Sequence, residues 1–136
     1  MRVVIDCNAL VSAALTDGTC RAAIILAAGN DDIVVSAPIL AEYRAVLMRP
    51  KYRKCQAVAL SVIDMLESIA RRVEPLEAAP PLPDPKDSVY LATALASRAD
   101  VIITGNARDF PPHLCEPVRI LTPRAFLDLS KPGGKA

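Results

Sequence analysis

The sequence predicts an α/β domain, in which helices cover a mainly parallel central sheet. Strand-like and helix-like segments alternate along the chain, and the strand-like segments are short and apolar on both faces. Such strands are typical of parallel sheets, because helices cover both faces of the sheet and connect its successive strands. The length of 136 residues suits one domain. We expect the domain to span residues 1–129 and residues 130–136 to form a flexible tail.

Short apolar runs rich in β-branched residues predict the strands. The first run is expected to end at Asp6, next to Asn8, which can cap a helix. The predicted strands are residues 2–7, 31–36, 101–104 and 118–121, with a further short strand or extended segment at residues 73–76.

Capping residues predict the first helices. Asn8 is expected to cap a helix over residues 9–15, and Thr19 a helix over residues 20–28 that ends at Gly29-Asn30. Ser36 then marks the start of a third helix, with Pro38 near its first turn.

Apolar spacing predicts the next helices after a break at Arg49-Pro50. A longer helix is expected over residues 55–72. Its expected inward positions are Val58, Val62, Met65, Leu66, Ile69 and Val73. A proline-rich loop over residues 77–86 leads to a helix that begins at Asp87. Residues 105–112 are expected to form a loop, and Thr122 to cap a last short helix.

The charge balance excludes one class of protein. The chain has 16 Lys and Arg against 15 Asp and Glu, a net charge of +1, whereas proteins that hold nucleic acid by bulk charge are usually basic. A nucleic-acid enzyme stays possible. No run approaches 18 apolar residues, so we expect no membrane span. The four cysteines form no Cys-x-x-Cys pair and the chain opens without a signal-peptide pattern, which predicts free thiols in a reducing cytoplasm.

Acidic residues recur at the predicted carboxyl edge of the sheet, where the functional sites of such sheets lie. Asp6 ends the first strand, and Asp109 lies in the loop after residues 101–104. Glu42 lies near the apolar face of the helix that follows the second strand. Asp87 begins a helix that should run antiparallel to the strands, which brings its start to the same edge. Polar residues at the same level are Asn8, Ser36, Thr104 and Asn106.

Each acid also has an ordinary structural interpretation. Asp87 could be a helix N-cap, Glu42 half of a salt bridge, Asp6 a turn former and Asp109 a surface loop residue. Together, carboxylates that converge without basic partners would repel one another and raise their pKa values. A hard cation such as Mg²⁺ or Mn²⁺ removes this conflict and activates water for phosphodiester hydrolysis.

Four segments resemble, in order and spacing, the motifs of the PIN-domain family of metal-dependent ribonucleases, and most of all its VapC-type toxins. These segments are residues 4–10 (VIDCNAL), 36–43 (SAPILAEY), 84–95 (DPKD followed by LATAL) and 103–110 (ITGNARDF). The resemblance implies that the catalytic, metal-binding acids are Asp6, Glu42, Asp87 and Asp109. It also implies supporting roles for Asn8, Thr104 and Asn106. Some family members carry the fourth acid at the position of Asn106, and others three residues later, as at Asp109.

The resemblance also implies an architecture and partners. It implies a three-layer α/β/α sandwich with four or five mainly parallel strands, Mg²⁺ or Mn²⁺ as cofactor, and RNA as substrate. It further implies a cognate antitoxin and a homodimer or higher even oligomer. Asp84 could reach the site or cap the proline-rich loop, and we favour the loop role.

A basic cluster follows Glu42 and could hold RNA phosphates, with Tyr43 or Tyr52 stacking on a base. The cluster consists of Arg44, Arg49, Lys51, Arg53 and Lys54. Arg108, beside Asp109, is a further candidate for phosphate contact. The alternative for the cluster is a solvated corner between two helices.

Two other functions compete with the nuclease. A phosphotransferase with a phospho-aspartate mechanism would favour an Asp-x-Asp start, which Asp6-Cys7-Asn8 lacks, and no glycine-rich phosphate loop is present. A non-catalytic PIN-fold module that binds RNA or protein is the second alternative. Metal binding that disappears in Asp6→Asn would favour the enzyme.

Overall fold

A computed structural model describes residues 1–130 of the chain. The tail predicted at residues 130–136 therefore lies outside the described residues, except for Ser130. The five strands are β1 (Arg2–Ile5), β2 (Asp32–Val35), β3 (Arg71–Arg72), β4 (Val101–Ile103) and β5 (Arg119–Leu121). They form one sheet in the order β3-β2-β1-β4-β5, and every neighbouring pair is parallel. This confirms the predicted parallel sheet.

The strand order reverses direction at β1. The chain adds β2 and β3 on one side of β1, and then returns to add β4 and β5 on the other side. Val3 pairs with Ile33 of β2 on one side and with Val101 of β4 on the other. In sheets wound this way, the connections leave the carboxyl ends of the two central strands in opposite directions and open a crevice there. The crevice of this protein therefore lies at the ends of β1 and β4.

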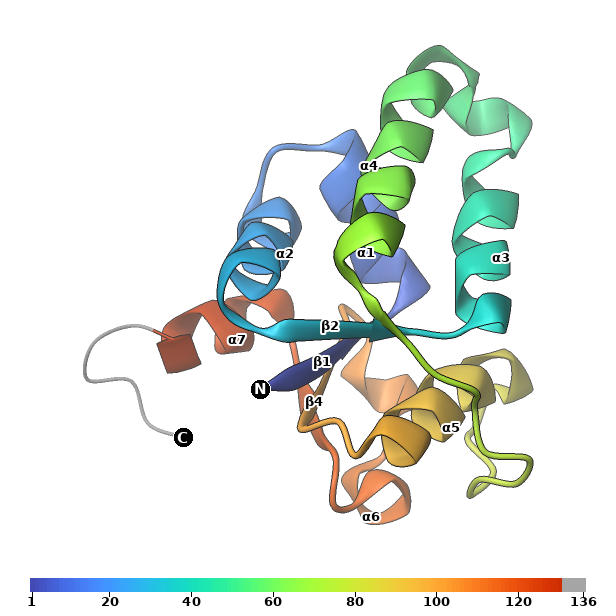
Figure 1. The fold of residues 1–136 in the computed structure, drawn as a ribbon, viewed down its shortest axis with the longest axis vertical. Helices are drawn as coiled ribbons and strands as arrows, with labels where there is room; N and C mark the ends of the chain where they lie inside the picture. Colours follow the sequence, from blue (N-terminus) through green and yellow to red (C-terminus); the bar gives the residue numbers. More distant parts are fainter. Residues whose placement is uncertain (131–136) are drawn as a thin grey trace.

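Helices cover both faces of the sheet. Figure 1 shows α1, α2, α3 and α4 above the strands, and α5 and α6 below them. The upper helices are α1 (Cys7–Leu15), α2 (Thr19–Asn30), α3 (Ala37–Leu47) and α4 (Gln56–Ile69). The lower helices are α5 (Ser88–Ser97) and α6 (Pro112–Cys115), and α7 (Pro123–Ser130) packs against α2 and β5. The result is the three-layer α/β/α arrangement.

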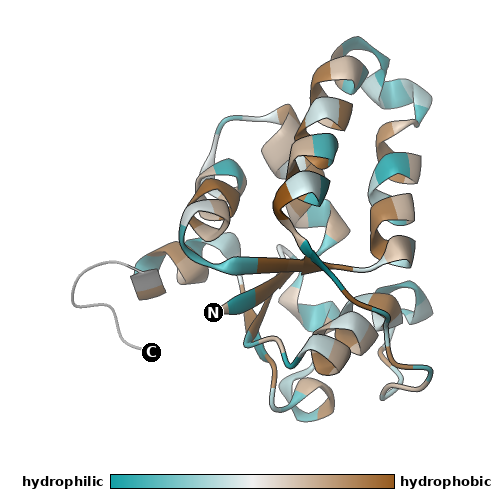
Figure 2. Ribbon diagram, viewed as in Figure 1, coloured by the Kyte–Doolittle hydropathy of each residue, from teal (hydrophilic) through white to brown (hydrophobic). Residues whose placement is uncertain are grey.

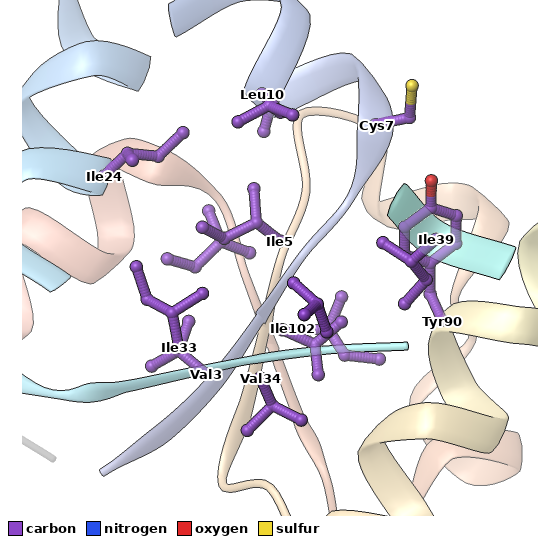
Figure 3. Packing of buried hydrophobic residues seen from close by; sticks show 14 of the residues in the cluster. Val3, Ile5, Cys7, Leu10, Ile24, Ile33, Val34, Ile39, Tyr90 and Ile102 are labelled. Atoms are coloured by element: carbon purple, nitrogen blue, oxygen red, sulfur yellow. The ribbon is translucent and has the colours of Figure 1, made fainter. Parts of the chain in front are cut away.

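The core lies between the sheet and its helices. Figure 2 colours the central strands mostly brown, with teal concentrated on helices and connections. In Figure 3, Ile33 and Val34, which are neighbours on β2, point to opposite sides of the sheet, as alternate strand residues do. Leu10 of α1 and Ile24 of α2 lie on the side of Ile33. Both faces of the strands are thus apolar because both are covered.

Some predicted boundaries are wrong at the helix ends. Asn8 does not cap α1, because Asp6 holds the N-cap position and its side chain accepts the N–H of Cys7. Thr19 is the first residue of α2 rather than its cap, and the helix continues through Gly29-Asn30 instead of ending there. The short α6 falls in a segment for which no helix was predicted.

The long helix is also shorter and rotated relative to the prediction. It ends at Ile69, and Arg71–Arg72 form β3, so the third strand precedes the predicted residues 73–76. The buried residues of α4 are Ala59, Ile63 and Leu66. The predicted inward residues Val58, Met65 and Ile69 are instead 62%, 59% and 52% exposed. The helix has two apolar stripes. When the stripe of Ala59, Ile63 and Leu66 is buried, Asp64 and Glu67 are placed to form ion pairs with Arg44 on α3.

Within residues 1–130, the short 3₁₀ helices are η1 (Pro50–Cys55), η2 (Pro85–Asp87) and η3 (Ala107–Asp109). The first fills the predicted break at Arg49-Pro50. All four cysteines are free, as predicted. Within the described residues no single helix is long and apolar enough to cross a membrane, and α1 and α2, bent by 105°, pass that test only as a pair.

Candidate active site

Asp6 lies at the carboxyl end of β1, where the crevice opens. Its side chain is 4% exposed and both of its oxygens accept hydrogen bonds. One accepts the N–H of Cys7 at 2.9 Å, and the other accepts the hydroxyl of Thr104 at 2.9 Å. Thr104 directly follows β4, so the bond joins the ends of the two central strands. The carboxylate is fixed by the fold itself.

A chain of hydrogen bonds continues from Thr104 to Asp109. The hydroxyl oxygen of Thr104 accepts the N–H of Asn106 at 3.0 Å. The side-chain amide of Asn106 then donates to Asp109 at 2.7 Å. The structure therefore brings Asn106 and Asp109 together. Asn106 is the hydrogen-bond donor, and Asp109 is the carboxylate at the fourth acidic position.

Glu42 projects from α3 and is held by a residue that the sequence argument did not single out. The hydroxyl of Tyr90, on α5, donates to Glu42 at 2.8 Å. Glu42 forms no salt bridge within residues 1–130, so the ion-pair interpretation is wrong there. The signal for Tyr90 was available, because a tyrosine on a buried helix face usually needs a partner for its hydroxyl.

Asp87 occupies the N-cap position of α5 without acting as a cap. Its side chain forms no capping hydrogen bond. Asp84 does cap, because it accepts the N–H of Lys86 at 3.0 Å and starts η2, which confirms its loop role. Asp84 nevertheless lines the same groove as Asp87.

The carboxylates are close enough to repel one another. Burial, and after it the charges of Asp6, Asp109, Asp84 and Glu42, together raise the pKa of Asp87 to about 7. Burial also raises the pKa of Asp6, with contributions from Glu42 and Asp109, although the hydrogen bonds from Thr104 and Cys7 act in the opposite direction. The four predicted acids therefore share one electrostatic environment, as expected from their positions at one edge.

Cys7 lies between the acids but is not a nucleophile at neutral pH. Burial raises the pKa of its thiol to about 12, and the charges of Glu42 and Asp6 raise it as well. The thiol therefore stays protonated, so the strong metal-binding atoms at this site are oxygen atoms and not the sulfur of Cys7.

The donor chemistry fits a hard divalent cation. Within the described residues none of the four carboxylates pairs with Lys or Arg, so their charges lack a counterion. Mg²⁺ and Mn²⁺ prefer such oxygen ligands. As the side chains stand, no three His, Cys, Asp or Glu residues in the described part are arranged to hold an ion. Shared binding of an ion therefore requires these side chains to draw together.

A groove of about 640 Å³ runs from the acids along α1 and α3. Its acidic end is lined by Glu42, Asp84, Asp87 and Asp109, together with Cys7, Asn8 and Lys86. Its other end reaches η1. Lys86 was not among the predicted residues, although its place between two acids of the DPKD segment was a signal.

The structure divides the predicted basic residues into two groups. Arg49 and Lys51 line the groove. Arg44 does not, because its guanidinium binds Asp64 at 3.0 Å and Glu67 at 2.6 Å on α4. Arg53, Lys54 and Arg108 are exposed and do not line the groove.

Comparison with known proteins identifies the family. A model of the PIN domain matches residues 2–108, which is most of the chain. The chain belongs to the PIN domain family. Members of this family are generally nucleases and generally use divalent metal ions.

A solved structure shares the fold of this PIN domain. VapBC2 from Rickettsia felis, crystallised with a DNA fragment from its promoter, has a chain that is 17% identical, with a TM-score of 0.63. The match covers 90% of this chain and 98% of the other. A search of curated proteins found no match.

Proposed function

We propose that this PIN domain is a Mg²⁺- or Mn²⁺-dependent endoribonuclease, and that it is the toxin of a toxin–antitoxin pair. The observation that carries the nuclease proposal is the unneutralised carboxylate cluster at the crevice between β1 and β4. Family membership supports it, because PIN domains are generally nucleases. RNA as the substrate follows from the motif resemblance and the basic residues in the groove.

The proposed roles follow from the hydrogen bonds. Asp6, Glu42, Asp87 and Asp109 would hold the metal, which supplies a water of lowered pKa and neutralises charge on the phosphate. Thr104 aims Asp6, Tyr90 aims Glu42 and Asn106 aims Asp109. Such partners fix the orientation of a ligand before the metal arrives. Asn8 lines the groove and stays a candidate for contact with water or substrate.

Cleavage of RNA tests the nuclease proposal. Purified protein is incubated with total RNA and Mn²⁺, with and without EDTA, and the fragments are sequenced to map cleavage sites. Wild type is expected to cut and Glu42→Gln to be inactive, while Asp64→Asn, which removes an acid on α4, stays active. Retention of RNA without cleavage would support the non-catalytic binding module instead.

The toxin role needs a separate test. The structural match is to a VapBC2 complex, and an antitoxin partner for this chain is proposed by analogy with it. Expression in bacteria is expected to stop growth, and co-expression of the neighbouring reading frame to restore it. We also propose a cytoplasmic homodimer, which light scattering of the purified protein would detect as twice the chain mass.

A further inference from the structure

The groove between α1 and α3 has two chemically different ends. The acidic end presents three of the proposed metal ligands, Glu42, Asp87 and Asp109, and the other end presents Arg49, Lys51 and Tyr52. The wall between them is largely apolar, with Val11 and Leu15 contributed by α1. With the proposed cation bound at the acidic end, a ligand that spans the groove would offer anionic groups at both ends and an apolar surface between them. A nucleic acid strand meets this description, because phosphates alternate with bases.

Tyr52 is the aromatic side chain that the described residues place in this groove. Tyr43, the other tyrosine of the predicted basic cluster, is fully buried, and its hydroxyl donates to the carbonyl of Ile5. Tyr43 is therefore unable to meet a base. Tyr52 is only half-buried, and the ammonium of Lys51 lies 5.0 Å from the centre of its ring. Part of the Tyr52 side chain packs against the core, and a flexible lysine lies over its ring.

We propose that Tyr52 is the base-stacking residue of the groove and thereby selects for an unpaired nucleotide at one position of the substrate. This inference rests on the proposed RNA hydrolysis. A base replaces the Lys51 ammonium on the ring, and Lys51 turns to the adjoining phosphate. The exchange is favourable because base–aromatic stacking is stronger than an exposed cation–π contact. Neither Arg49 nor Lys51 has an ion-pair partner within residues 1–130, so both cations are available.

Helix α3 separates Glu42 from Arg49, which lines the groove together with Tyr52. Arg49 lies seven residues after Glu42, and most of that interval is α3, so the two are about 10 Å apart along the helix axis. The stacked base therefore belongs to a nucleotide that flanks the cleaved bond, not to the nucleotide at the metal. A base within a duplex has its faces covered by its neighbours, so the strand must be unpaired at this position.

The test combines protein variants with abasic substrates. A short RNA spanning a mapped cleavage site is synthesised with an abasic nucleotide at each position in turn. Cleavage in Mn²⁺ is followed for wild type, Tyr52→Phe and Tyr52→Leu, with Val58→Ala as a control at an exposed position of α4 that does not line the groove. Thermal melting confirms that each variant is folded.

The expected result is specific to one position. Tyr52→Leu raises KM for the intact RNA on the order of tenfold, while Tyr52→Phe and Val58→Ala stay near wild type. One abasic position raises the wild-type KM by a similar factor and removes the difference between wild type and Tyr52→Leu. A Tyr52→Leu defect that is equal for every abasic RNA, or no defect at all, overturns the proposal.

Binding separates this inference from the proposed function. If wild type does not cleave RNA, the nuclease proposal fails, and the comparison is repeated by fluorescence anisotropy with labelled RNAs. A stacking role still predicts that Tyr52→Leu and one abasic position weaken binding without adding together. If no RNA binds, both proposals fail.

Discussion

Acidic residues have different kinds of partners at the two edges of the central sheet. At the amino edge, Asp31 binds the terminal amino group of Met1 at 2.9 Å, and Asp100 accepts the N–H of Arg2 at 2.8 Å. Asp32 lies 3.4 Å from the guanidinium of Arg71. Each of these acids has a local partner, and each partner belongs to a strand or to its immediate flank.

Within residues 1–130, the acids at the carboxyl edge have neutral donors only, whereas Asp31 and Asp32 at the amino edge are paired with cations. Thr104 donates to Asp6, and Tyr90 donates to Glu42. Such donors orient a carboxylate without cancelling its charge, so repulsion remains and raises the pKa of Asp87 to about 7 after the larger effect of burial. The same residue type thus stabilises one edge and leaves the other in need of a counterion, which is the mark of a functional site.

The largest expected contrast between the edges is in catalysis. Asp6→Asn should lower the rate of RNA cleavage by about 100-fold or more, because loss of a residue that merely orients a metal ligand already costs roughly 10–100-fold. Asp32→Asn, at the amino edge, should stay within about twofold of wild type, since exposed ion pairs contribute little. Initial rates in Mn²⁺ measure both. Equal losses in the two variants would contradict the functional difference between the edges.

The two edges were also unequally predictable from sequence. The place of Asp6 followed from a buried apolar run that ends in an acid, and the parallel sheet fixed which edge it faces. The same reasoning brought in Asp109, because it follows β4. Local patterns therefore sufficed where an acid ends a strand, as Asp6 does, or lies in the loop after one, as Asp109 does.

Those local patterns could not predict contacts between helices that lie far apart in the sequence. The partner of Glu42 is Tyr90, 48 residues away, and the pairing depends on how α3 meets α5. The predicted rotation of α4 was wrong because two apolar stripes fit the same spacing, and the packing of Ala59, Ile63 and Leu66 into the core selects between them. The helical spacing of apolar residues alone predicts neither the pairing of Glu42 with Tyr90 nor the rotation of α4.

A divalent cation should stabilise the carboxyl edge of the folded protein. At a concentration about 100 times its dissociation constant, Mn²⁺ adds about 2.7 kcal/mol to the free energy of unfolding, which raises the melting temperature by roughly 5–15 °C. Thermal melting with Mn²⁺ or EDTA measures the shift. The variant Asp6→Asn/Asp87→Asn should lose most of it, and Asp31→Asn should keep it. A full shift in the double variant would place the ion elsewhere.

Without metal, stability should depend on pH through Asp87. Its folded pKa of about 7 exceeds the ordinary value of 3.8, so between these values the folded state holds a proton that the unfolded state has lost. The free energy of unfolding therefore falls as pH rises through this window. Asp87→Asn removes the penalty and should be more stable than wild type at pH 8 by roughly 1–2 kcal/mol, allowing for solvent screening, with no gain near pH 3. Urea unfolding in EDTA measures both, and a constant difference would contradict the prediction.

The smallest expected effect isolates the hydrogen bond that orients Glu42. Tyr90→Phe removes only a hydroxyl and leaves Glu42 free to rotate, so we expect the dissociation constant for Mn²⁺ to rise by up to about tenfold. Calorimetric titration measures this constant. The change should appear in metal affinity more than in stability, because Glu42 is half-buried and can turn to water.

Tyr43→Phe is the matched control, because Tyr43 is an equally buried tyrosine whose hydroxyl donates to the backbone of β1 and not to an acid. Losing that bond should cost about 1 kcal/mol of stability and leave the affinity for Mn²⁺ unchanged. The two variants delete the same atom from the same residue type on neighbouring helices. If both variants weaken Mn²⁺ binding equally, Tyr90 acts through general packing. In that case the hydrogen bond from Tyr90 to Glu42 is not what orients this carboxylate for the metal ion.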